Sequence, residues 1–222
     1  MNQTTLLLSI FYLIISCNYT DQRKQKQTVA NNAVNKTSSE NQVNCNHPDA
    51  PGICMFMNMP TSLDHRINIP IYDEKQNLII AGKVLNAETK KPLSGIYMYA
   101  YHTDENGLYS KNGNEEGIQK IHGKYHGWCV TDEEGNYEIH TIKPGAYPSR
   151  NTPAHIHAWL KIDDDHIFYI NDFVFADDRL VNSSYLAKMV NKNNPKELDN
   201  GVVELSLSEG KYIGRRDINI VE

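Results

Sequence analysis

Residues 78–103 read LIIAGKVLNAETKKPLSGIYMYAYHT, and this stretch decides the expected fold. It begins with an apolar run at 78–85, turns at Pro92 and Gly95, and continues with a second run at 96–103. In the second run tyrosines alternate with aliphatic residues, which places the two kinds on opposite sides of a strand. Pro and Gly between two such runs indicate a connection between strands. The stretch therefore predicts a strand, a turn and a second strand.

Short apolar runs separated by turn residues continue along the rest of the chain. We expect further strands at residues 127–130, 137–142, 154–162, 166–175, 201–210 and 211–222. Residues 183–191, SSYLAKMVN, have a helical pattern with Leu186, Met189 and Val190 on the apolar face. This arrangement predicts an all-β fold, a β-sandwich of mostly antiparallel strands with one short helix and long loops.

The composition is that of one domain of moderate size plus appendages, with 222 residues of which 40% are hydrophobic. A formal net charge of −5 and the absence of a basic block argue against nucleic acid as a partner. Tyrosine is frequent, with 13 Tyr against 5 Phe and 2 Trp. Tyrosine suits half-buried strand positions, and it is the aromatic residue that can become an anionic oxygen ligand.

The N-terminal segment has the pattern of an export signal. Residues 6–16, LLLSIFYLIIS, form an apolar run too short to span a bilayer, and IISC, which ends at Cys17, resembles the lipobox of bacterial lipoproteins. The opening MNQTT lacks the Lys or Arg typical of such signals, and a buried N-terminal strand is the alternative. We expect lipidation of Cys17 and export to the periplasm or cell surface, with membrane contact only through the lipid.

The expected organisation has four parts. Residues 1–17 are a lipoprotein-type signal segment, 18–44 a disordered polar tether, 45–66 a transitional loop, and 67–222 the β-sandwich domain. The tether is rich in Asn, Gln, Ser and Thr and has no hydrophobic period. In an oxidising compartment Cys45 and Cys54 are close enough in sequence to close a small loop, and Cys129 is expected as a buried thiol.

Residues 153–160, PAHIHAWL, carry the main chemical signal. On a strand, His155 and His157 project from the same side, so both imidazoles can bind one ion. The pattern alone is weak, because a packed strand can contain two histidines by chance. Upstream, Tyr147 lies in a stiff loop rich in proline, either as a core residue or as a phenolate ligand. Tyr109, after the turn DENG, is a second tyrosine on a loop.

Two histidines and two tyrosines together favour ferric iron. A phenol has an ordinary pKa of about 10 and ionises at neutral pH only beside a strong positive charge. Fe(III) supplies that charge and prefers anionic oxygen ligands. Zinc more often recruits Cys or carboxylate ligands.

Three stretches, in this order, resemble the intradiol ring-cleavage dioxygenases: residues 82–109, residues 131–148 (TDEEGNYEIHTIKPGAYP) and PAHIH at 153–157. The resemblance implies an oxidoreductase of aromatic compound catabolism with one mononuclear, non-haem Fe(III) held by Tyr109, Tyr147, His155 and His157. Tyr109 would stay on the metal, whereas Tyr147 would leave it when substrate binds and act as a catalytic base. The substrates would be a catechol-type aromatic diol and O₂, the product a ring-opened dicarboxylate, and the enzyme a homo-oligomer.

Three positions depart from the family pattern. Thr152 stands where the family has an arginine, and Arg150 is expected to replace part of the lost charge as a catalytic residue. Asp172 stands near the place of a family glutamine, and Tyr101 near the place of a tryptophan. Thr152, Asp172 and Tyr101 are therefore the expected substrate-binding residues. An acidic Asp172 would disfavour a carboxylated diol by charge repulsion.

Two other functions fit parts of the pattern. Residues 82–96 and 131–139 also resemble transthyretin-like sandwiches, which would make the chain a non-catalytic binding module of an exported lipoprotein. A zinc or copper site at His155 and His157, with His140 or His126 as a helper, is the other alternative. The remaining histidines are expected at the surface or in loops, namely His47, His65, His102, His122 and His166.

Overall fold

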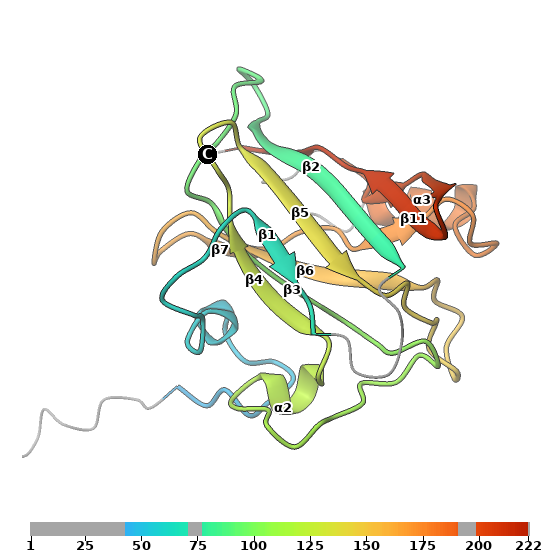
Figure 1. The fold of residues 1–222 in the computed structure, drawn as a ribbon, viewed down its shortest axis with the longest axis horizontal. Coiled ribbons are helices and arrows are strands. Elements are labelled where there is room, and N and C mark those ends of the chain that lie inside the picture. Colours follow the sequence, from blue (N-terminus) through green and yellow to red (C-terminus); the bar gives the residue numbers. More distant parts are fainter. Residues whose placement is uncertain (1–42, 71–76, 191–198, 222) are drawn as a thin grey trace, which may run out of the picture. The chain divides into compact units, whose positions relative to one another are not determined.

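Two β-sheets form the body of the structure, which is a computed structural model that describes residues 43–70, 77–190 and 199–221 (Figure 1). Asn44–Glu222 forms one compact unit. The predicted signal segment with Cys17, and residues 18–42 of the predicted tether, lie outside the described residues.

The first sheet has the strand order β1-β5-β2-β11-β10, and β12 also pairs with β2. Its strands are β1 (Arg66–Asn68), β2 (Leu78–Asn86), β5 (Asn136–Thr141), β10 (Leu205–Ser208), β11 (Lys211–Arg215) and β12 (Ile218–Ile220). Strand β2 lies at its centre and alternates between buried and half-buried residues, as the apolar run at 78–85 predicts.

The second sheet has the order β4-β3-β6-β8-β9, and β7 also pairs with β6. Its strands are β3 (Tyr97–His102), β4 (His126–Val130), β6 (His155–Lys161), β7 (Ile167–Tyr169), β8 (Phe173–Phe175) and β9 (Val202–Val203). Across both sheets six pairings are antiparallel and four are parallel. The prediction of a mostly antiparallel all-β sandwich is confirmed.

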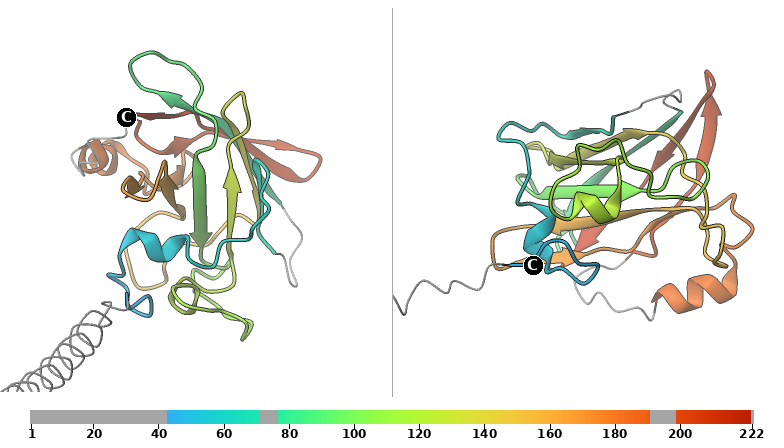
Figure 2. Two further views of the ribbon diagram at one scale, coloured as in Figure 1. Left: turned by 90° about the vertical axis from the view of Figure 1, so that its left-hand side faces the viewer. Right: turned by 90° about the horizontal axis from the view of Figure 1, so that it is seen from below.

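The helices are more numerous than predicted. Helix α3 (Ser183–Val190) is the expected one and lies on the outside of the sandwich (Figure 2). The described residues also contain α2 (Gln119–His122) and the 3₁₀ helix η1 (Gly52–Met55), both too short for a helical period to reveal. Among the described helices, none combines the length and hydrophobicity needed to cross a bilayer.

The interior between the sheets is mainly aliphatic. Strands of both sheets contribute residues that are 0% exposed, among them Ile67, Leu78, Ile80, Ile139, Met98, Ala100, Ile156, Ala158 and Leu160. Burial of each larger side chain contributes about 1.5–3 kcal/mol to folding. These residues alternate along β3 and β6 with tyrosine, histidine and tryptophan, so the second sheet has an aliphatic inner face and an aromatic outer face.

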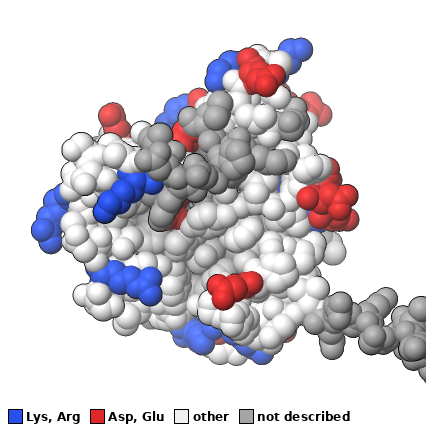
Figure 3. Space-filling view, turned by 180° about the vertical axis from the view of Figure 1, so that it is seen from behind, with Lys and Arg blue, Asp and Glu red and all other residues white. Residues whose placement is uncertain are grey.

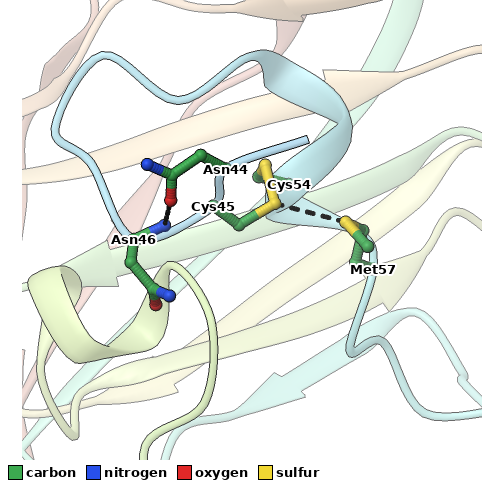
Figure 4. Close-up of a disulfide and its surroundings, with 5 residues drawn as sticks. All are labelled: Asn44, Cys45, Asn46, Cys54 and Met57. Atoms are coloured by element: carbon green, nitrogen blue, oxygen red, sulfur yellow. Dashed lines mark hydrogen bonds between the residues drawn. A yellow bond between two sulfur atoms is a disulfide. The ribbon is translucent and has the colours of Figure 1, made fainter. Parts of the chain in front are cut away.

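The segment from Asn44 to Met59 covers part of this aromatic face. Cys45 and Cys54 form a disulfide, and the Cys45 sulfur lies 3.2 Å from the Met57 sulfur (Figure 4). Met55 and Phe56 are buried against a cluster that includes Tyr99 and Trp128. The Trp128 indole donates a hydrogen bond to the Met55 carbonyl oxygen at 2.7 Å. Cys129 is a buried free thiol, as predicted.

The expected single strand at 166–175 is instead two strands, β7 and β8, which both pair with β6. Residues 170–172 separate them. The physical reason lies in the pairing register, which changes by one residue between β7 and β8.

Candidate metal centre

Strand β6 carries the two histidines, at its start and two residues further on. His155 is buried, 6% exposed, and His157 is half-buried. Strand β3 pairs with β6 so that Tyr101 lies opposite His157. Strand β6 is an inner strand of the sheet, so hydrogen bonds to β3 and β8 hold its backbone on both sides. The Cα positions of both histidines are therefore fixed.

Two loops bring Tyr109 and Tyr147 to these histidines. The loop after β3 and the loop before β6 are joined where the Gly145 N–H donates to the Asp104 carbonyl oxygen at 2.9 Å. Glycine is required on both sides of this joint: a Cβ at Gly145 would lie 2.2 Å from the Glu105 carbonyl oxygen. A Cβ at Gly107, whose φ is +78°, would lie 1.9 Å from the Ala146 carbonyl oxygen. The close approach of the two backbones places the two phenols together.

Four donor atoms form a continuous cluster. The Tyr109 and Tyr147 hydroxyl oxygens are 2.6 Å apart. The Tyr147 oxygen is 3.2 Å from His157 Nε2, which is 3.1 Å from His155 Nε2. Ligand atoms about 2.1 Å from one ion, at angles of about 90–110°, lie roughly 3.0–3.4 Å from one another. The contact between the two nitrogens and the contact between the Tyr147 oxygen and His157 Nε2 already have that spacing.

Hydrogen bonds at the far side of both imidazole rings direct the two Nε2 atoms toward the cluster. His155 Nδ1 is 2.7 Å from the Pro153 carbonyl oxygen, and His157 Nδ1 is 2.8 Å from Asp172 Oδ1. Carbonyl and carboxylate oxygens only accept hydrogen bonds, so each Nδ1 carries a proton and Nε2 is the atom of each ring that is left for a ligand. A cation between the two Nε2 atoms, which are 3.1 Å apart, could accept a lone pair from each neutral ring. The donor set therefore fits a bound metal ion.

Burial keeps the two phenols neutral when no metal is present. Burial raises the pKa of Tyr109, and its hydrogen bond to Tyr147 raises it further. Burial also raises the pKa of Tyr147, while the hydrogen bond from Tyr109 and the positive charge of Arg150 oppose that rise. Of the two phenols, Tyr147 is the one whose anionic form these contacts favour. An ion that binds both as phenolates must be strongly charged and prefer oxygen, as Fe(III) does.

Asp172 lies behind the His157 ring, on the side away from the cluster. The Tyr169 hydroxyl is hydrogen-bonded to both His157 Nδ1 and Asp172 Oδ1. Burial raises the pKa of Asp172, but the charge of and hydrogen bond from His157 outweigh it and lower this pKa to about 2. His155, His157 and Asp172 are the described His, Cys, Asp and Glu residues that come close enough to share an ion. Because Asp172 faces Nδ1, an ion bound at His157 Nε2 would lie on the opposite side of the ring from it.

Two histidines expected at the surface or in loops are buried, and one of them borders the site. His122 in α2 is 6% exposed and stacks on Tyr101 with ring centroids 3.5 Å apart. Tyr101 also stacks on His157, at 4.7 Å. His102 is 1% exposed and joins the sheets through a 2.7 Å hydrogen bond to Thr141. Their burial depends on contacts distant in the sequence, which no local pattern signals.

The other predicted residues lie at different distances from the cluster. Arg150 is exposed, and its guanidinium carbon is 5.5 Å from the centre of the Tyr147 ring. Thr152 is half-buried in the loop before β6. His140 lies in the first sheet and bonds Glu138, and His126 bonds the Gly123 carbonyl oxygen. Among the described residues, neither belongs to the group that is close enough to share an ion with His155 and His157, so the helper role expected for His140 and His126 in a zinc or copper site is wrong.

Comparison with protein families identifies the chain at this point. A family model described as dioxygenase matches residues 64–196, more than half of the sequence, and this span contains all four residues of the cluster. The chain belongs to the intradiol ring-cleavage dioxygenase family.

Curated relatives of the family match part of the chain. Over 111 residues it is 31% identical to the protocatechuate 3,4-dioxygenase beta chain of Burkholderia cepacia, a match that covers 50% of this chain and 44% of that protein. Over 95 residues it is 29% identical to catechol 1,2-dioxygenase of Candida albicans, covering 35% of this chain and 30% of that protein. The chain therefore spans less than half the length of either relative.

Solved structures of family members share the fold. The dioxygenase domain of a dioxygenase–carbohydrate-binding fusion from Streptomyces sp. SirexAA-E superimposes with a TM-score of 0.51 at 17% identity, covering 74% of this chain and 94% of that one. An intradiol ring-cleavage dioxygenase from Tetranychus urticae gives 0.50 at 20% identity, covering 73% and 89%. Catechol 1,2-dioxygenase from Pseudomonas arvilla C-1 gives 0.51 at 17% identity, covering 72% and 58%.

Proposed function

We propose that this chain is an Fe(III)-dependent dioxygenase that cleaves a catechol-type aromatic ring with O₂ to a ring-opened dicarboxylate. The observation that carries the proposal is the cluster of Tyr109, Tyr147, His155 and His157, linked by contacts of 2.6–3.2 Å. Membership of the family supports dioxygenase chemistry. The two curated relatives are named for catechol and protocatechuate, which are both aromatic 1,2-diols.

The cluster would hold the iron through two imidazole nitrogens and two phenolate oxygens. Bound Fe(III) would supply a Lewis acid that draws electron density from the diol and makes its ring reactive toward O₂. The two phenolates would neutralise most of the added charge, and the fixed tautomers of the histidines would present lone pairs to it.

Tyr147 is the residue we assign to proton transfer. A diol must lose hydroxyl protons to bind as an anion, and the Tyr147 oxygen accepts one of them. Tyr109 and Arg150 both favour the anionic form of Tyr147, the first through a hydrogen bond and the second through its charge. Tyr109 has the more strongly raised pKa and is the phenol expected to stay in place.

Tyr101 and Thr152 are proposed to border the diol. Tyr101 stacks on His157 and offers an aromatic surface beside the cluster. Thr152 provides a neutral hydroxyl at the position where a cation would recognise a carboxylate. An uncharged catechol is therefore the first substrate to test.

Export remains part of the proposal, with Cys17 as the site of lipidation and the membrane contacted only through that lipid. The Cys45–Cys54 disulfide supports an oxidising compartment such as the periplasm or the cell surface. On the face of the molecule in Figure 3, acidic and basic side chains are both present and neither forms a continuous patch over the described residues.

The decisive experiment is a visible absorption spectrum of the iron-loaded protein, with and without catechol. We expect a broad band from tyrosinate-to-Fe(III) charge transfer, a shift of the band when catechol is added, and equimolar consumption of O₂ and catechol. Iron-loaded protein that stays colourless would exclude two tyrosinate ligands and end the proposal.

Two controls separate the alternatives. Metal analysis of protein purified without added metal distinguishes iron from zinc or copper. A binding module without catalysis would hold iron no more tightly than micromolar, and His155→Ala would then change only its stability.

A further inference from the structure

Strands β7 and β8 leave an extra residue opposite His157. Trp159 pairs with Tyr169, and Ile156 pairs with Phe173. Two residues of β6 therefore face three residues of the partner segment, 170–172. One extra residue on one strand of an antiparallel pair is a β-bulge.

The bulge changes where the side chains point. In a regular strand, residues three apart face opposite sides, so Tyr169 and Asp172 would diverge. With one extra residue they share a side, and the Tyr169 hydroxyl donates to Asp172 Oδ1. The same carboxylate oxygen lies 2.8 Å from His157 Nδ1. His157, Tyr169 and Asp172 thus form a closed group of three hydrogen-bonded side chains.

The bulge is supported from behind by a buried ion pair. Arg216, 5% exposed, donates to the Asn171 carbonyl oxygen at 2.9 Å and pairs with Asp199 at 2.8 Å. Asn171 in turn donates to the Asp199 carbonyl oxygen at 2.6 Å. Gly201 lies against the bulge so closely that a Cβ there would be 2.1 Å from the Asp172 carbonyl oxygen. The position of Asp172 is therefore determined by the tertiary structure on both of its sides.

We propose that Asp172 and Tyr169 are positioning residues for His157, and that Asp172 does not bind the diol. The carboxylate accepts a hydrogen bond from His157 Nδ1–H, which fixes the ring orientation and would increase the electron donation of Nε2 toward a metal. Partners of this kind behind a metal-binding histidine change metal affinity by about 10- to 100-fold. The consequence for iron rests on the proposed function, whereas the pairing with His157 can be tested in the metal-free protein.

The test compares Asp172→Asn, Asp172→Ala and Tyr169→Phe with Asp164→Asn, which removes the same charge from an exposed position. With ferric ion as the probe and a competing chelator, Asp172→Ala should lower affinity about 10- to 100-fold and Asp172→Asn by less. The tyrosinate-to-iron band should move to longer wavelength in both, because weaker donation from His157 makes the metal a stronger acceptor. Tyr169→Phe should shift it less, and Asp164→Asn should not shift it.

A metal-free measurement keeps the two proposals separable. Nitrogen NMR of His157 should show the Nδ1–H tautomer in the wild-type protein and a mixture in the double variant Asp172→Ala/Tyr169→Phe, which removes both partners of Nδ1, whether or not iron proves to be the cofactor. A wild-type tautomer in this double variant would overturn the inference. So would a variant with unchanged iron affinity and band position but a raised KM for catechol, since that result would make Asp172 a substrate contact.

Discussion

The two faces of strands β3 and β6 differ in chemistry although alternate residues of the same two strands form them. The inner face, with Met98, Ala100, Ile156 and Ala158, is fully buried and aliphatic. The outer face carries Tyr101 opposite His157 and continues into the buried ring cluster around Tyr99. Side chains alternate between the two faces along each strand. Residues that stabilise the core and residues of the candidate metal centre are therefore direct neighbours in the sequence.

Substitutions of neighbouring residues on β3 and β6 should therefore have opposite effects on metal binding and on folding. Changes at the outer-face residues of the donor cluster should alter metal binding and turnover with little effect on folding. Changes on the inner face should alter folding with little effect on the chemistry of the protein that remains folded.

The largest effect is expected at Tyr147, which joins the outer face through its loop. Tyr147→Phe removes the hydroxyl and should lower turnover of catechol by roughly 10²–10⁴-fold, because that hydroxyl is both the proposed metal ligand and the proposed base. Steady-state O₂ uptake measures the turnover, and the visible spectrum reports the loss of the ligand. Tyr97→Phe on β3 is the control and should change neither. Near-normal turnover with an unchanged spectrum would contradict the assignment of Tyr147.

Ile156→Ala tests the inner face between the two histidines. Ile156 is 0% exposed, so its truncation should lower the free energy of unfolding by about 2–5 kcal/mol. Urea denaturation of the metal-free protein measures this loss. Iron affinity of the folded variant should stay within about threefold of wild type, and a loss of metal binding as large as that of His155→Ala would show that the two faces are not independent.

His102 is the titratable exception on the inner face, and it predicts acid sensitivity. Burial lowers its pKa from 6.5 to about 4, so between these values the unfolded chain binds a proton that the folded chain does not. Stability should therefore fall as the pH falls from 6.5 toward 4, by about 3 kcal/mol from this residue. Denaturation of metal-free protein across this range should show a flatter pH dependence in His102→Gln.

The smallest effect is expected at the Cys45–Cys54 disulfide, which lies in the segment that packs on part of the outer face. Cys45 and Cys54 are 9 residues apart in sequence, and loss of such a short closed loop should cost about 2–3 kcal/mol. Replacing both with Ala and measuring the free energy of unfolding tests this, with wild-type protein in reductant as the second arm. The iron spectrum should change little, because the loop packs on Tyr99 and Trp128 rather than on the four-atom cluster.

Much of the fold and part of the site could be predicted from local patterns. Strand β2 and strand β3 follow directly from alternating runs and turn residues, and His155 and His157 share a side because they are two residues apart. The meeting of Tyr109 with Tyr147 was accessible only through a family resemblance. His122 gave no signal, because a four-residue helix has no measurable period and its burial comes from stacking on another strand.

By itself the sequence determined the alternation of strands, the separation of aliphatic from aromatic faces and the pairing of the two histidines, since all of these depend on neighbours along the chain. Only the tertiary structure decided that two loops would join at Gly107 and Gly145, and that a bulge would turn Asp172 toward His157. The physical reason is that strand register and backbone approach are set by contacts between distant segments. The local pattern of residues 168–175, FYINDFVF, does not specify which residue is left over when this segment pairs with β6.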